Sequence, residues 1–88
     1  MKILNRLIPV ILILILMPVH VYADDEADFQ DGLDAYEKKD YKVALEKWRL
    51  LAEKGNAAAQ YNIGLMYGKG QGVTQHYKEQ ARWYRKAA

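Results

Sequence analysis

The chain of 88 residues contains no cysteine and no serine, and it has only two histidines, His20 and His76. The absence of cysteine excludes disulfide bonds, thiol catalysis and thiolate metal sites. A nucleophile poised beside a base is also hard to assemble from so small a set of reactive side chains. We therefore expect a protein that is not an enzyme and that has no cofactor and no metal site.

Only one long hydrophobic run is present, and it lies near the start of the chain. Lys2 and Arg6 precede the apolar residues 7–17, and small residues stand three and one positions before a possible cleavage site after Ala23. This order is typical of a secretory signal peptide over residues 1–23, and the run is shorter than the ~20 residues of a spanning helix. We expect a cleaved, periplasmic or secreted protein with no membrane span; an uncleaved anchor is the alternative.

The chain has little net charge. Its 13 Lys and Arg residues exceed its 11 Asp and Glu residues by two, and Lys2 and Arg6 account for that surplus. The chain from residue 24 onward is therefore neutral when histidine is uncharged. Because nucleic-acid binding depends on concentrated positive charge, we expect no nucleic-acid partner.

Apolar residues recur at helical spacing over the rest of the chain. They predict four helices, over residues 25–38, 41–54, 57–67 and 77–88. Asp40 is the expected N-cap of the second helix, and Gly55 stands just past its end. The third helix is apolar nearly all round, which is typical of a helix packed between others.

The four helices repeat a common pattern. A shift of 36 residues superposes the second helix on the fourth, and a shift of 32 residues superposes the first on the third. The difference of four residues lies in a loop, residues 68–75, that contains several glycines. The clearest matches are Tyr41 with Tyr77, Trp48 with Tyr84, and Gly32 with Gly64. The chain is thus read as two helix pairs, the first with a tight turn and the second with a longer loop.

The sequence AQYNIGLMYGKGQGV, followed by YKEQARWYRKAA, resembles a Sel-one-like repeat, and GLDAYEKKDYKVALEKW resembles a tetratricopeptide-type unit. The resemblance implies an all-α fold, a short α-solenoid of about two antiparallel helix pairs. A tetratricopeptide-like pair would span residues 24–55, and a Sel-one-like repeat, apparently cut short at its C-terminus, residues 56–88. Such families hold protein partners together. The residues that define the repeats are Gly32, Tyr41, Ala44, Trp48, Tyr61, Gly64, Tyr67, Gly70, Gly72, Tyr77, Tyr84 and Ala87.

The sequence departs from the family pattern at Thr74, His76 and Gln80, where that pattern tends to have Pro, Asp and Ala. Histidine is a weaker N-cap than aspartate, and Gln80 is larger than its counterpart Ala44. We therefore expect the start of the fourth helix to be less firmly specified than that of the second.

Two stretches invite a ligand-binding interpretation. Residues 68–72, Gly-Lys-Gly-Gln-Gly, follow a helix and lack the Lys-Ser/Thr pair of a phosphate loop. We expect an inter-helix turn with its glycines at positive φ. The seven acidic residues between positions 24 and 37 lack the spacing of a calcium loop, and we expect them to form a solvated helix face.

The fourth helix carries the candidate partner surface. The residues expected on its inner face are Tyr77, Ala81, Tyr84 and Ala88. Trp83 falls outside that face and its repeat counterpart is Lys47, so we expect Trp83 to be partly exposed, as tryptophans at interfaces are before they bind. The possible partner surface comprises Trp83, Arg82, Arg85 and Lys86.

Two functions remain open at this point. The first is an exported, non-catalytic repeat module that mediates protein–protein interaction. The second is a truncated or minimal repeat protein that folds only on self-assembly or on stacking with another repeat protein. The seven acids of residues 24–37 and the five bases of residues 69–88 would favour head-to-tail contacts between copies.

Overall fold

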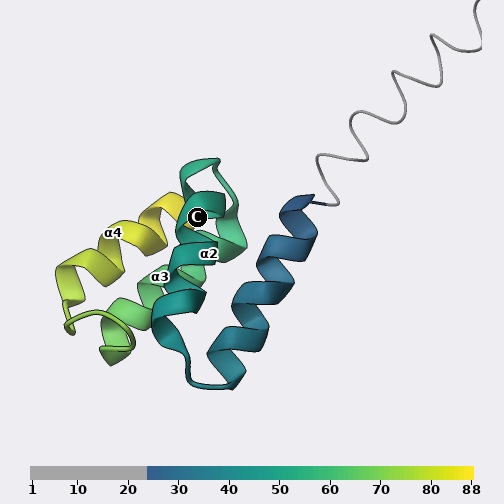
Figure 1. Cartoon of the computed structure of the whole chain (residues 1–88). Helices are drawn as coiled ribbons and strands as arrows, with labels where there is room; N and C mark the ends of the chain where they lie inside the picture. The colour runs from purple at the N-terminus through teal and green to yellow at the C-terminus, as the bar shows by residue number, and fades with distance from the viewer. Residues whose placement is uncertain (1–23) are drawn as a thin grey trace, which may run out of the picture.

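The structure is a computed structural model, and it describes residues 24–88; the predicted signal peptide lies outside the described residues. The helices are residues 24–37, Tyr41–Glu53 (α2), Ala57–Lys69 (α3) and Tyr77–Ala87 (α4) (Figure 1). Residues 24–88 contain no strand. The all-α prediction is confirmed, and each helix begins and ends within two residues of its expected bounds.

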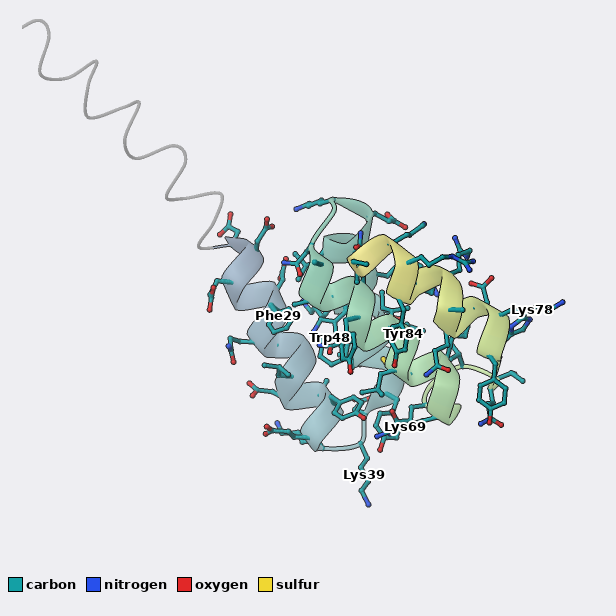
Figure 2. All side chains as sticks on the ribbon, turned by 180° about the vertical axis from the view of Figure 1, so that it is seen from behind. Phe29, Lys39, Trp48, Lys69, Lys78 and Tyr84 are labelled. Atoms are coloured by element: carbon teal, nitrogen blue, oxygen red, sulfur yellow. The ribbon has the colours of Figure 1, made fainter. Side chains whose placement is uncertain are left out.

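Successive helices run antiparallel and form a short row of helix pairs, as the repeat predicts (Figure 1). In the first pair, Phe29 lies against Trp48 far from the turn, with ring centroids 6.0 Å apart (Figure 2). Next to the turn, Tyr36 lies against Tyr41 with ring centroids 5.3 Å apart. The helix α3 packs against α2 and also against α4. The prediction that the third helix lies between others is therefore confirmed.

Each pair contains a glycine that receives an aromatic ring from the facing helix. A Cβ atom added at Gly32 would lie 2.7 Å from Cδ1 of Trp48, and one added at Gly64 would lie 2.7 Å from Cδ1 of Tyr84. Carbon atoms cannot approach so closely, so only glycine lets the ring lie against the helix backbone. The two shifts of the sequence superpose these two contacts, which shows that both pairs are built on one plan.

The two pairs differ at the positions next to the contact between glycine and ring. In the first pair the first of the two helices has the larger side chain there, and in the second pair the second helix has it. Tyr36 of the first helix contacts Tyr41 and Trp48 of α2. Between these two positions in the sequence, α2 has the small, fully buried Ala44. At the corresponding positions, α3 has Gly68 and α4 has Gln80. A Cβ atom at Gly68 would lie 2.6 Å from Cδ of Gln80, so Gly68 leaves room for the flexible end of the Gln80 side chain. The departure at Gln80 is thus compensated by a change on the facing helix.

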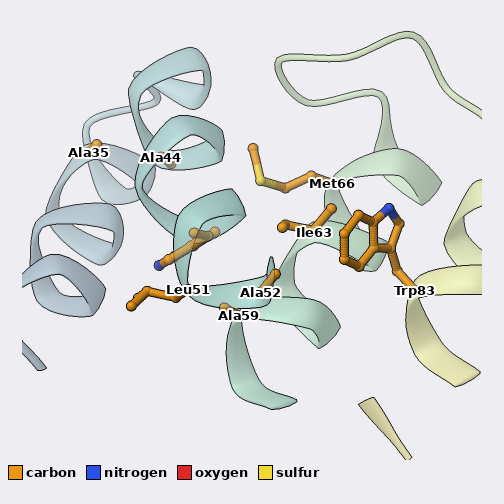
Figure 3. Packing of buried hydrophobic residues seen from close by; sticks show 9 residues of the cluster. Ala35, Ala44, Leu51, Ala52, Ala59, Ile63, Met66 and Trp83 are labelled. Carbon is orange, nitrogen blue, oxygen red and sulfur yellow. The ribbon is translucent and has the colours of Figure 1, made fainter. Parts of the chain in front are cut away.

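The buried side chains form one cluster between the helices (Figure 3). Gln60 is buried among them, and its Nε2 donates a hydrogen bond to the Ala52 carbonyl at 3.0 Å. The buried amide group is therefore hydrogen-bonded, as buried polar groups generally are. The apolar members of the cluster are Ala35, Ala44, Trp48, Leu51, Ala52, Ala59, Ile63, Met66 and Trp83.

The first three helices end in the same way, with a residue in the left-handed region. These residues are Lys39, Gly55 and Gly70, with φ of 63°, 96° and 68°. The next N–H then donates to a carbonyl five residues back, in the Schellman arrangement. The bonds are Asp40 to Ala35 at 2.8 Å, Asn56 to Leu51 at 3.0 Å and Gln71 to Met66 at 2.9 Å. Lys39 alone of the three has a Cβ atom, which costs about 1–2 kcal/mol in this conformation.

The start of α4 is specified by its own side-chain cap. Nδ1 of His76 accepts a hydrogen bond from the N–H of Glu79 at 3.2 Å, whereas Asp40 stands at the N-cap position of α2 without a side-chain hydrogen bond. The expectation that His76 caps less firmly than Asp40 is therefore wrong. Asp40 also completes the turn from the first helix through its bond to Ala35, and this bond fixes its backbone orientation.

We expect Gly64→Ala to lower the free energy of unfolding by about 1–3 kcal/mol, because the added methyl group meets the Tyr84 ring and the Gln80 carbonyl. Gly68→Ala on the same helix is the matched control. Its methyl group meets only the flexible end of Gln80, and alanine favours the helix by up to about 1 kcal/mol. Urea denaturation measures both variants, and equal losses would contradict the role of the ring contact.

We expect Lys39→Gly to raise the free energy of unfolding by about 1 kcal/mol, because glycine removes the Cβ clash of the left-handed conformation. Gly55→Ala, at the equivalent position after α2, should destabilise the protein for the same reason. Thermal unfolding followed by circular dichroism tests the pair. A lower melting temperature for Lys39→Gly would show that the turn is not strained.

Candidate functional site

Trp83 is buried, with 7% of its surface exposed, so the prediction of partial exposure is wrong. Its ring packs beside Ile63 and Met66 (Figure 3). The prediction assumed that Trp83 has the same environment as its repeat counterpart Lys47. Lys47 lies at the outer edge of the first pair, where it forms ion pairs with two aspartates of the first helix. The same position in the second pair lies beside α2 and is covered.

Because Trp83 is buried, the side of α4 that faces solvent differs from the side that the sequence predicted. The predicted inner face is half-buried at Tyr84 but exposed at Tyr77, Ala81 and Ala88. The prediction is therefore wrong at three of these four positions. The side that faces the core consists instead of Gln80, Trp83 and Ala87. Because Gln80 is polar, the sequence pattern did not indicate that this side of α4 faces the core.

The exposed side of α4 continues onto α3 through Tyr61. The Tyr61 ring stacks on Tyr84 with centroids 5.0 Å apart and an interplanar angle of 16°, yet Tyr61 remains 52% exposed. Tyr77, one end of the exposed side, is 67% exposed. We name Tyr61, Tyr77, Ala81 and Tyr84 the tyrosine face. It presents large aromatic surfaces with hydroxyl groups, a combination that is typical of protein interfaces.

The basic residues of the predicted partner surface lie on the other side of α4. Arg82 places Cζ 5.1 Å, and Lys86 places Nζ 4.6 Å, from the centroid of the Trp83 ring. Cations are attracted to the face of an indole ring. Arg82 also forms an ion pair with Glu79 at 2.8 Å. Arg82 and Lys86 therefore lie together around the Trp83 ring, and Arg85 is exposed on the same helix.

The loop between α3 and α4 folds back against the first pair. Gly70 and Gly72 have the predicted positive φ, but Gly68 lies inside α3, so the prediction is wrong for that residue. A Cβ atom at Gly72 would lie 3.0 Å from the Tyr41 carbonyl oxygen. The loop glycines therefore serve a turn and a close backbone approach.

The acidic first helix is partly neutralised by α2. Nζ of Lys54 lies 3.1 Å from Asp25, and Nζ of Lys47 lies 3.9 Å from both Asp28 and Asp31. These pairs connect the first helix to α2. No group of three or more His, Cys, Asp or Glu side chains within residues 24–88 is arranged to hold a metal ion. Over the same residues, no helix has both the length and the hydropathy of a membrane span.

Comparison of the chain with protein-family models, with curated proteins and with solved structures finds no match. The four-helix arrangement is compatible with a helical repeat.

The Arg82 guanidinium donates hydrogen bonds to the Glu79 carboxylate and lowers the pKa of that carboxyl from its ordinary value. The pair therefore contributes a small stability above the ordinary pKa of glutamate, which is lost as the pH falls through the lowered pKa. An NMR titration of the Glu79 carboxyl carbon should show the lowered pKa, and Arg82→Gln should raise it towards the ordinary value. Identical titrations in the two proteins would contradict the ion pair.

Proposed function

We propose that this protein is a non-catalytic repeat module that binds another protein through the tyrosine face. The observation that carries the proposal is the exposure of Tyr61 and Tyr77, at 52% and 67%. The first helix pair has α3 packed against it, whereas no further helix covers the tyrosine face within residues 24–88. A helix of a partner can pack on this exposed face.

The chemistry of the tyrosine face suits a helical partner. Tyrosine rings bury a large area at low entropic cost and still offer a hydroxyl group for hydrogen bonding. Ala81 lies between them and lets a partner backbone come close. The stacked pair of Tyr61 and Tyr84 is held in place within the protein, so it loses little freedom when a partner binds.

We further propose that the two helix pairs are related to known helical repeats and that the protein is exported. The repeated contact of a glycine with an aromatic ring supports a relationship of the two helix pairs to tetratricopeptide and Sel-one-like repeats. The basic, apolar and small-residue order of residues 1–23 supports export, to the periplasm or out of the cell.

Site-specific photo-crosslinking in the cells that make the protein tests this proposal. Benzoylphenylalanine in place of Ala81 should form an adduct with another protein, because Ala81 lies in the tyrosine face. The same group in place of Leu50, which is 59% exposed on α2, is the control and should not. Tyr61→Glu with Tyr77→Glu should abolish the adduct from position 81. No adduct there, or equal adducts from both positions, would contradict the proposal.

A second candidate function is self-association of the chain. The first helix carries seven acids and no base, whereas Lys78, Arg85 and Lys86 of α4 form no ion pair within residues 24–88. The acidic helix of one copy could therefore lie against α4 of the next. An adduct with the mass of two copies in the crosslinking experiment would select this candidate over a different protein.

A further inference from the structure

A groove lies between α2 and α4, on the side of α4 opposite the tyrosine face. It has a volume of about 360 Å³. We name it the α2–α4 groove, and its lining residues are Arg49, Glu53, Tyr67, Arg82, Trp83 and Lys86. It combines three cations with one carboxylate, so its field favours an anionic ligand.

Two of the three cations are available to such a ligand. Arg82 is engaged by the Glu79 carboxylate through two of its nitrogens. Arg49 and Lys86 form no ion pair within residues 24–88, although Lys86 lies near enough to Glu79 to help lower the pKa of that carboxyl. Lys86 instead lies over the Trp83 ring, which holds its ammonium group at the groove. Charge-assisted hydrogen bonds from such groups are the stronger kind.

The indole N–H of Trp83 provides an independent indication. Trp83 lines the groove and is 7% exposed, yet its Nε1 has no hydrogen-bond acceptor among the described residues. Buried donors of this kind are almost always paired in native proteins. The nitrogen lies on the side of the ring away from Ile63 (Figure 3). The nitrogen is covered in the free protein, and a ligand that displaces its cover would bring the acceptor that satisfies it.

We propose that the α2–α4 groove binds a carboxylate side chain of an acidic peptide segment in a partner protein. Arg49 and Lys86 contact the carboxylate, and the Trp83 Nε1–H and the Tyr67 hydroxyl donate to its oxygens or to a neighbouring carbonyl. Glu53 favours a peptide over a phosphate ion, because a peptide also brings N–H donors that a carboxylate can accept. This inference rests on the proposed protein-binding function and adds a second contact, on the opposite side of α4.

NMR spectroscopy of the ¹⁵N-labelled protein tests the proposal through its two indole N–H signals. The probe is a capped peptide of alternating glutamate and glycine, with the glutamine peptide as its control. We expect the glutamate peptide to shift the Trp83 signal downfield in a saturable manner. The Trp48 signal should stay in place, because its Nε1 already donates to the Phe29 carbonyl at 3.3 Å. Trp83→Phe assigns the two signals.

Charge variants test whether the peptide binds in the α2–α4 groove. Arg49→Gln with Lys86→Gln should weaken peptide binding by about tenfold or more. Lys78→Gln with Arg85→Gln removes the same charge outside the groove and should have less than a twofold effect. Arg49→Lys with Lys86→Arg should retain binding. Circular dichroism confirms that each variant is folded.

Three results would overturn the assignment. The first is a Trp83 signal that does not move, and the second is an equal loss of binding in the two glutamine variants. The third is an equal shift with inorganic phosphate at the same concentration, which would make the groove a general anion site. Because Ala81 and the groove lie on different sides of α4, crosslinking can succeed while peptide binding fails, so the two proposals are separable.

Discussion

The contact between a glycine and an aromatic ring sets the spacing of the helices in both pairs. Gly32 receives Trp48, and Gly64 receives Tyr84. Without a Cβ atom at these positions, each ring lies directly on the facing backbone, and the helices approach more closely than other side chains would allow. The remaining core residues are small or fill the space that this approach leaves. The helix α3 then packs against α4 within its own pair and against α2 of the first pair.

The surfaces of the protein follow from this packing. With Tyr84 seated on Gly64, α4 is rotated so that Trp83 enters the core beside α2 and α3. One side of α4 then exposes Tyr77 and Ala81, and the other places its cations around the indole ring. The tyrosine face and the α2–α4 groove are therefore two consequences of one rotation, and changes at Gly64 should affect both.

The sequence was sufficient to predict the bounds of the helices and their arrangement in pairs. Apolar spacing, glycines after helix ends and the two repeat shifts can all be read directly from the order of the residues. The sequence did not predict how α4 is rotated about its axis, that is, which of its sides faces the core. Comparison with Lys47 gave the wrong environment for Trp83, since equivalent positions of a short repeat differ when one lies at the edge and the other between helices. The clue that could have corrected it is Gly68, whose small size matches the larger Gln80 on the facing helix and places Gln80 inward. The sequence indicated His76 only as a weak cap, whereas its Nδ1 accepts a hydrogen bond from the N–H of Glu79.

The two helix pairs close one core within a single chain and leave the tyrosine face exposed to solvent. Sedimentation equilibrium combined with far-ultraviolet circular dichroism, from micromolar to millimolar protein, tests it most directly. We expect a helical monomer with cooperative unfolding at the lowest concentrations, because Trp48, Ile63 and Trp83 are already buried within one copy. Helicity that develops only as the mass increases would contradict this and would mean that assembly completes the fold.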